Sequence, residues 1–112
     1  MKEQQIPLEK TIVNGIMAWI KKQGYPFVYK THGSVYQRTG IPDITLVGRG
    51  GRFIGLEVKR PKVGRLTAIQ ALTLNAINAG GGYAAVVTSL EEAQAAILAA
   101  EAGEKGKEYK AL

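Results

Sequence analysis

The stretch from Gly40 to Gly64, "GIPDITLVGRGGRFIGLEVKRPKVG", constrains the fold of this chain more than any other. Two short apolar runs flank a glycine-rich turn, a pattern that predicts a β-hairpin. A three-residue loop from Arg49 to Gly51 puts Gly51 where such loops need a left-handed backbone. Gly50 is then the centre of the hairpin, and the numbers of opposed residues sum to 100. The turn therefore predicts one defined register.

This register places two carboxylates opposite each other at the open end of the hairpin. Asp43 faces Glu57, and Lys59 lies on the same face because side chains alternate along a strand. The other face is apolar and consists of Ile44, Leu46, Ile54, Leu56 and Val58. Opposed Cβ atoms lie roughly 4.5–5.5 Å apart in a sheet, so the carboxylates repel and one keeps its proton unless a cation lies between them. We therefore predict a divalent cation at this end.

The three charged residues also suggest a chemistry. Mg²⁺ and Mn²⁺ suit oxygen ligands, and Mg²⁺ usually takes only one or two carboxylates from the protein. The Lys59 ammonium lies on the same face and can reach a metal-bound water or a scissile phosphate. An activated water, a Lewis acid and a positive charge are what phosphodiester hydrolysis requires. The pattern predicts a nuclease-type site.

An ordinary structural explanation exists for each of these residues taken singly. Asp43 can serve as a turn or strand-start residue. Glu57 and Lys59 can form an ion pair on a solvated face, worth about 0.2–1 kcal/mol. That explanation does not account for the three charges gathering on one face, nor for the basic "KRPKVGR" that begins at Lys59.

The remaining sequence predicts an α/β fold with one domain in residues 1–103 and a frayed tail in residues 104–112. Apolar residues recur at helical spacing after Pro7, and Ser89 with Glu92 forms a capping-box start for the last helix. The expected elements are a helix over 7–22, strands over 27–31, 43–47 and 52–59, a helix over 67–79, a strand over 83–88, and a helix from 89 to about 103.

Composition limits the classes of function. The absence of cysteine excludes disulfides, thiolate zinc sites and cysteine nucleophiles, and one histidine cannot build a histidine-rich metal site. The net charge of +6 attracts polyanions such as nucleic acid. No apolar run approaches the ~20 residues of a membrane helix, and the first residues lack the apolar core of a signal peptide. We expect a cytoplasmic protein, bacterial or phage-encoded, with no membrane partner.

The residues of the hairpin carry a resemblance to a known family. Pro42 and Asp43, followed by the "EVK" of residues 57–59, resemble the signature of PD-(D/E)xK nucleases. The longer pattern "GIPDI…LEVKRPKVGRLTAIQ" is similar to the VRR-NUC family, and the resemblance covers roughly residues 7–90. It implies a restriction-endonuclease-like αβββαβ core, with a mixed central sheet flanked by helices, plus a C-terminal helix.

The same resemblance implies roles for individual residues. Asp43 and Glu57 would bind the metal together with the backbone carbonyl of Val58, and Lys59 would be the catalytic lysine. The family motif continues to a glutamine on the following helix, where this chain has Gln70. That residue would be catalytic by positioning the lysine or a water, although its amide can also be satisfied locally in the helix.

A further metal ligand is implied by the likeness of the family to archaeal Holliday-junction resolvases. In those enzymes a glutamate near the start of the first helix joins the site, and Glu9 is the candidate in this chain. Glu9 borders the inward face of the predicted helix. Its alternative role is that of a first-turn acid that favours the helix dipole.

Basic and polar residues on both sides of the motif are expected to contact phosphates. Most of them also fit an ordinary solvated basic face. The candidates for DNA binding are Lys30, Ser34, Arg38, Arg60, Lys62 and Arg65, with His32, Tyr36 and Gln37 in the same loop before the hairpin.

These inferences combine into one expected function. We expect an endonuclease that depends on Mg²⁺ or Mn²⁺ and cleaves branched DNA, such as four-way junctions, as a homodimer. Two alternatives are a flap or end-processing nuclease and a catalytically silent DNA-binding module that keeps the fold.

Overall fold

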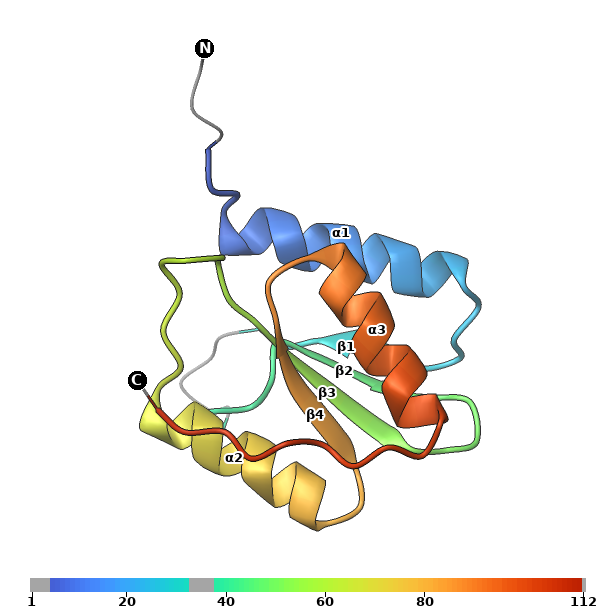
Figure 1. Cartoon of the computed structure of the whole chain (residues 1–112). Helices are drawn as coiled ribbons and strands as arrows, with labels where there is room; N and C mark the ends of the chain where they lie inside the picture. Colours follow the sequence, from blue (N-terminus) through green and yellow to red (C-terminus); the bar gives the residue numbers. More distant parts are fainter. Residues whose placement is uncertain (1–4, 33–37, 112) are drawn as a thin grey trace.

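The predicted helices and strands are present in the predicted order. In a computed structural model of the chain, residues 5–32 and 38–111 are described. The elements are α1 (Glu9–Lys22), β1 (Val28–Lys30), β2 (Ile44–Val47), β3 (Phe53–Val58), α2 (Ala68–Ala79), β4 (Tyr83–Val87) and α3 (Leu90–Glu101) (Figure 1). The first helix begins two residues after Pro7, because Leu8 at its N-cap has an extended backbone.

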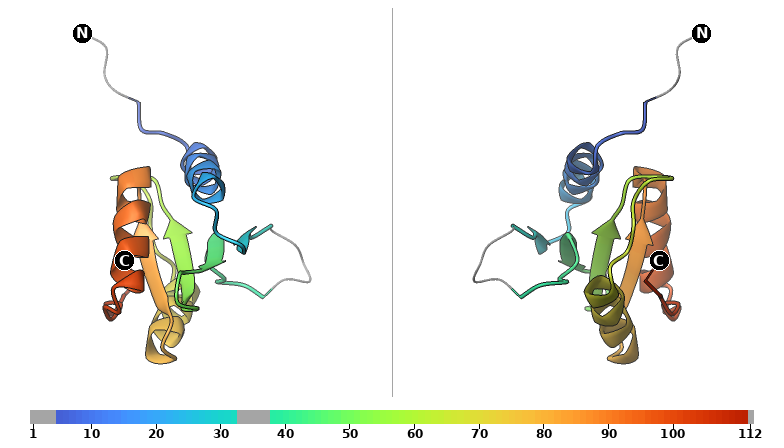
Figure 2. Two further views of the ribbon diagram at one scale, coloured as in Figure 1. Left: turned by 90° about the vertical axis from the view of Figure 1, so that its right-hand side faces the viewer. Right: turned by 90° about the vertical axis from the view of Figure 1, so that its left-hand side faces the viewer.

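The strands form one mixed sheet, as expected, in the order β1-β2-β3-β4. β1, β2 and β3 are antiparallel neighbours, whereas β4 runs parallel to β3 because α2 connects them. Helices α1 and α3 pack on one face of the sheet and α2 on the other (Figures 1 and 2). In the described residues, none of the helices combines the length and the apolar character that crossing a bilayer requires.

The register of the β2–β3 hairpin is confirmed. Ile44 pairs with Leu56 and Leu46 pairs with Ile54, so the numbers of these partners sum to 100. The Gly48 amide donates to the Arg52 carbonyl at 2.8 Å and closes the three-residue loop. Two glycines inside that loop, at positions 50 and 51, both have φ of 93°. A positive φ favours glycine, so the turn needs glycine at both positions. The sequence predicted this backbone conformation for Gly51 alone.

The larger core lies under α1 and α3. The apolar face predicted for the hairpin is fully buried there, each of its five side chains being 0% exposed. Isoleucines from α1 and α3 cover it, among them Ile16, Ile20 and Ile97. A smaller core under α2 contains Leu66, Ala71, Leu74 and Ala84. The opposite face of the hairpin, which carries Glu57, is therefore the face that α2 adjoins.

The prediction of a frayed tail is wrong. Residues 104–111 have no regular structure, yet they are hydrogen-bonded to α2. Asn75 accepts from the Tyr109 amide at 2.8 Å and donates to the Tyr109 carbonyl at 2.9 Å. The Tyr109 ring packs against the smaller core. Side-chain amides on α2 thus replace the missing backbone partners of the tail.

Arg52, directly after the three-residue loop of the hairpin, ties three segments together. Its guanidinium donates to the carbonyls of Gly81, Gly82, Ala100 and Glu104. These acceptors belong to the turn before β4, the last turn of α3 and the start of the tail. A planar guanidinium offers five donors in a fixed geometry, which explains how one side chain serves four carbonyls.

We predict that Arg52→Ala lowers the free energy of unfolding by about 2–3 kcal/mol, because carbonyls in three segments lose a charged donor. Arg52→Lys should recover only about half of that loss, since an ammonium cannot span the same acceptors. Urea unfolding measures both, with the exposed Lys22→Ala as the control. Equal stability of Arg52→Lys and wild type would contradict the role of the guanidinium geometry.

Candidate functional site

The site lies where the hairpin ladder breaks. The bond from Gly48 to Arg52 means that even-numbered residues of β2 are hydrogen-bonded to β3, so the next partner of Val58 would be Pro42. Proline has no N–H and cannot donate to the Val58 carbonyl. The Pro42 carbonyl accepts instead from the Thr31 hydroxyl at 2.7 Å. The backbone groups of Val58 are thus released from the ladder at this position.

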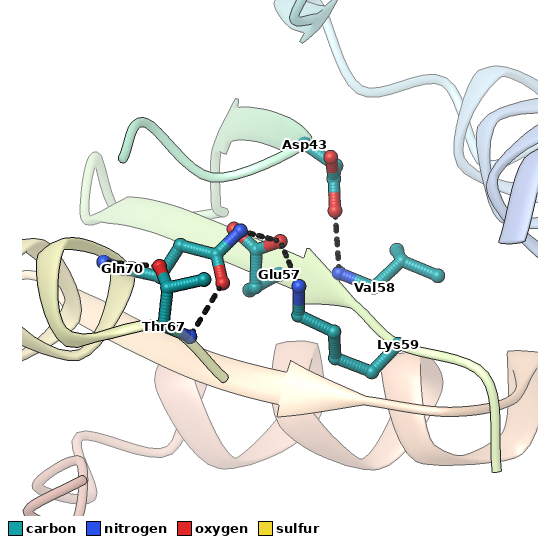
Figure 3. A network of polar contacts seen from close by, with 6 residues as sticks. All are labelled: Asp43, Glu57, Val58, Lys59, Thr67 and Gln70. Carbon is teal, nitrogen blue, oxygen red and sulfur yellow. Dashed lines mark hydrogen bonds and ion pairs between the residues drawn. The ribbon is translucent and has the colours of Figure 1, made fainter. Parts of the chain in front are cut away.

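Asp43 takes the place of the missing ladder partner. Its Oδ2 accepts from the Val58 amide at 2.7 Å, across the hairpin end (Figure 3). The N–H and C=O of one residue in an antiparallel ladder point to the same side. The Val58 carbonyl therefore points toward the side on which Asp43 lies, and the bond to Val58 holds the Asp43 carboxylate in place.

Glu57 is a carboxylate buried in the sheet, with only 1% of its surface exposed. Its Oε2 accepts from the Gln70 amide at 3.2 Å and lies 3.6 Å from the Lys59 ammonium (Figure 3). Its Oε1 is also buried and has no hydrogen-bond partner in the part of the chain that the structure describes. A buried oxygen of this kind is costly unless a proton or a cation serves it.

The surroundings of Glu57 decide whether its carboxyl carries a proton or binds a cation. The pKa of Glu57 is raised to about 8, mainly by burial and next by the negative charge of the neighbouring Asp43, while Lys59 opposes the rise in part. Without a cation the carboxyl is therefore protonated at neutral pH. A divalent cation between Asp43 and Glu57 would keep both ionised, as the sequence argument requires.

The orientation of Gln70 is fixed by the start of α2. Thr67 is the N-cap, and its hydroxyl accepts from the Gln70 amide N–H while Gln70 Oε1 accepts from the Thr67 N–H. This capping box leaves the side-chain NH₂ of Gln70 to face Glu57. The family resemblance implied that Gln70 positions the lysine or a water. In the structure its side-chain amide donates to the same Glu57 oxygen that Lys59 approaches.

Glu9 lies at the border of this cluster. It begins α1 and lines, together with Asp43, Thr31 and Lys30, a small cleft of about 190 Å³. Burial raises the pKa of Glu9, the Asp43 charge raises it further, and Lys59 opposes both. Across residues 5–32 and 38–111, however, no three His, Cys, Asp or Glu side chains come close enough together to hold a metal ion. Glu9 thus borders the site beside Asp43 without completing a cluster of three ligand side chains in the described residues.

The donor set fits a hard divalent cation. Two carboxylates, of Asp43 and Glu57, and the carbonyl of Val58 are oxygen ligands, the kind that Mg²⁺ and Mn²⁺ prefer. Mg²⁺ usually takes one or two carboxylates and fills its other positions with water and substrate oxygens. The described residues provide no hydrogen bond for the buried Oε1 of Glu57, and a bound divalent cation would satisfy this oxygen.

Three of the candidate DNA-binding residues follow β3 directly. Lys62 and Arg65 line a cleft of about 430 Å³ together with Lys59. Arg60 lines the same cleft, but its guanidinium donates to the carbonyls of Pro7 and Ile6, at 3.0 and 3.1 Å. It ties the segment before α1 to the end of β3.

The other candidates lie before the hairpin. Lys30 shares the cleft of Glu9 and Asp43, and its ammonium is 3.4 Å from Asn14 Oδ1. Arg38 is exposed, as is His32, whose ring meets Tyr29 edge to face. The remaining three candidates, Ser34, Tyr36 and Gln37, lie outside the described residues.

Residues at the other end of the chain also line the cleft beside Lys59, and no motif in the sequence marks them as part of the site. Lys107, Tyr109 and Lys110 of the tail line the cleft that contains Lys59. The only local signal was a pair of asparagines on α2, Asn75 and Asn78, which lie one helical turn apart and bond to the tail backbone.

The arrangement of the whole chain is similar to that of a known structure. A solved structure described as "VRR_NUC domain protein" matches with a TM-score of 0.74 and 14% sequence identity, over 92% of this chain and 95% of that chain. No protein-family model and no curated protein matches the sequence. At this identity the match shows a shared fold, and the predicted fold class is thereby confirmed.

Proposed function

We propose that this protein is a nuclease that hydrolyses phosphodiester bonds in DNA and depends on a divalent metal ion. The observation that carries the proposal is the buried Glu57, whose Oε1 meets no hydrogen-bonding group of the described chain, next to Asp43 and Lys59. Two neighbouring carboxylates at a buried site are unfavourable when both are ionised, unless a cation lies between them. The fold shared with a VRR_NUC domain protein gives further support.

Each residue of the cluster has a distinct part in this proposal. Asp43, Glu57 and the Val58 carbonyl would hold Mg²⁺ or Mn²⁺, which when bound supplies a Lewis acid and an activated water. The Lys59 ammonium, 3.6 Å from Glu57, compensates the negative charge that develops on the phosphate. Gln70 acts as a positioning residue, because its amide holds one Glu57 oxygen and leaves the other free for the metal.

Cleavage of branched DNA, such as four-way junctions, by a homodimer is the specific form of this proposal. Its support is the basic cleft beside Lys59, since phosphate contacts position a duplex without reading its sequence. Paired symmetric cuts in a junction would favour the homodimer, and single cuts beside a flap would favour an end-processing enzyme. Metal-dependent binding without any cleavage would favour the silent DNA-binding module.

We predict that Asp43→Asn and Lys59→Ala each reduce cleavage of labelled DNA in Mg²⁺ by about 100-fold or more, because each removes a group that acts at the phosphate. The matched control is Lys22→Ala, at the exposed end of α1 away from Glu9, which should cleave like wild type. Full activity of either site variant would refute the assignment.

The raised pKa of Glu57 predicts a pH dependence of stability in the absence of metal. The folded-state pKa is about 8 and the ordinary value is 4.5, so the contribution of this group is present below pH 4.5 and lost as pH rises toward 8. The loss is at most about 1.4 kcal/mol per pH unit. Glu57→Gln should lack it, and urea unfolding in EDTA across this range compares the two proteins.

Added Mn²⁺ provides the converse experiment at the alkaline end of that range. It should stabilise wild type, whose Glu57 carboxylate gains a partner, and leave Glu57→Gln unchanged. Parallel stability curves for the two proteins in EDTA would contradict the buried-acid account, and equal stabilisation by Mn²⁺ would contradict the metal site.

Two variants at the start of α2 separate capping from positioning. Thr67→Ala removes the cap and should cost about 1 kcal/mol of stability while Gln70 still reaches Glu57. Gln70→Ala should cost a similar amount and also weaken Mn²⁺ binding about tenfold, because the Glu57 carboxylate loses the donor that orients it. Calorimetric titration with Mn²⁺ measures the difference. Equal affinities in the two variants would show that Gln70 serves only the helix.

A further inference from the structure

The cleft beside Lys59 has a second wall that comes from the other end of the chain. One wall is the connection from β3 to α2, and the opposite wall is the tail, with Val86 and Thr88 of the β4 end between them. Figure 1 shows the tail running back from the end of α3 to finish near this connection. The described charged side chains that line the cleft are all basic: Lys59, Arg60, Lys62, Arg65, Lys107 and Lys110.

The tail is held in this position by specific bonds. Asn75 pairs with both backbone groups of Tyr109, and Asn78 donates to the Lys107 carbonyl at 3.1 Å. The Tyr109 hydroxyl accepts from the Val86 amide at 3.2 Å, on the outer edge of the sheet. A Cβ on Gly106 would collide with the Asn78 side-chain amide, so the tail approaches α2 as closely as glycine permits.

Two of these six cations have partners in the described chain, because Lys59 pairs with Glu57 and Arg60 donates to the carbonyls of Pro7 and Ile6. The other four, Lys62, Arg65, Lys107 and Lys110, are exposed, and their positive potentials add up in the cleft and favour a bound anion. Of the two tail lysines that line the cleft, Lys107 has a described cation–π contact, in which its ammonium lies 5.2 Å from the centre of the Tyr109 ring. The facing wall carries a strained residue as well, since Lys62 has φ of 69° in a tight turn closed by the Gly64 amide and the Arg60 carbonyl. The bonds that hold the tail place Lys107 and Lys110 at the cleft, and the strained turn places Lys62 at the same cleft.

We propose that the tail forms the second wall of a groove for the phosphodiester backbone, in which Lys107 and Lys110 bind phosphates opposite Lys62 and Arg65. The groove opens beside Lys59, so the bound strand leads to the scissile position. The identification of the anion as nucleic acid rests on the proposed function. The contribution of the tail does not require that the site be catalytic.

The test measures binding without catalysis. A short fluorescein-labelled DNA duplex is titrated by anisotropy in EDTA at several salt concentrations, so that cleavage plays no part. Lys107→Gln with Lys110→Gln should weaken binding about tenfold and reduce the salt slope of log K by about two, one for each phosphate that the variant no longer neutralises. The control pair is Lys21→Gln with Lys22→Gln, in the last turn of α1, which changes the net charge equally.

Equal losses in the two pairs would overturn the proposal, because they would report only the net charge. Unchanged binding in the tail pair would overturn it as well, even if cleavage in Mg²⁺ were normal. Conversely, a loss of binding in the tail pair alone supports the groove, even if the wild type cleaves no DNA. The absence of cleavage would count against the nuclease proposal and not against the groove.

A charge-neutral variant guards against a folding artefact. Gly106→Val displaces the tail from Asn78 without altering any charge, and it should weaken duplex binding while the far-ultraviolet circular dichroism stays native. Wild-type affinity in Gly106→Val would overturn the docked position of the tail. The exposed Lys110→Gln alone should reduce the salt slope by about one.

Discussion

Pro42, two residues before β2, sets the condition on which the rest of the site depends. Because Pro42 cannot donate to Val58, the β2–β3 ladder ends there, and the backbone of Val58 becomes available to a side chain. Asp43 occupies that opening. The proline ring also fills the space over Gly55, where a Cβ would approach it at 3.0 Å. One residue therefore ends the strand, frees a carbonyl and packs the face on which Glu57 lies.

Burial of the Glu57 carboxyl is the electrostatically unfavourable feature of this arrangement. A carboxyl that is 1% exposed, with its pKa raised to about 8, destabilises the folded protein whenever it ionises without a partner. Gln70 and Lys59 satisfy only one of its oxygens. The larger core on the other face of the sheet, which includes Ile16, Ile20 and Ile97, supplies the stability that makes such a residue tolerable. A strained or costly group in a well-packed scaffold is what functional sites commonly contain.

Local patterns predicted the hairpin and its charged end, and long-range contacts decided the rest. The register followed from the glycine turn, because the loop length fixes which residues oppose each other and a one-residue slip would move a strand's apolar side chains to the other face. The partner of Gln70 could not be predicted, because it depends on how the crossover lays α2 against β3. The order in the tail was equally hidden, since a polar segment gives no apolar signal and its bonds come from Asn75, more than 30 residues away.

The two ends of the hairpin are connected through the tail. At the turn end, Arg52 donates to the Glu104 carbonyl and fixes where the tail leaves α3. From there the tail crosses α2, held by Asn78, and reaches the cleft beside Lys59 at the open end. Arg52, which directly precedes β3, thus fixes the path of the tail that flanks Lys59, the residue directly after β3. Hydrogen bonds to backbone carbonyls and amides hold most of this path, and Tyr109 adds the packing of its ring against the smaller core and a bond from the Val86 amide to its hydroxyl.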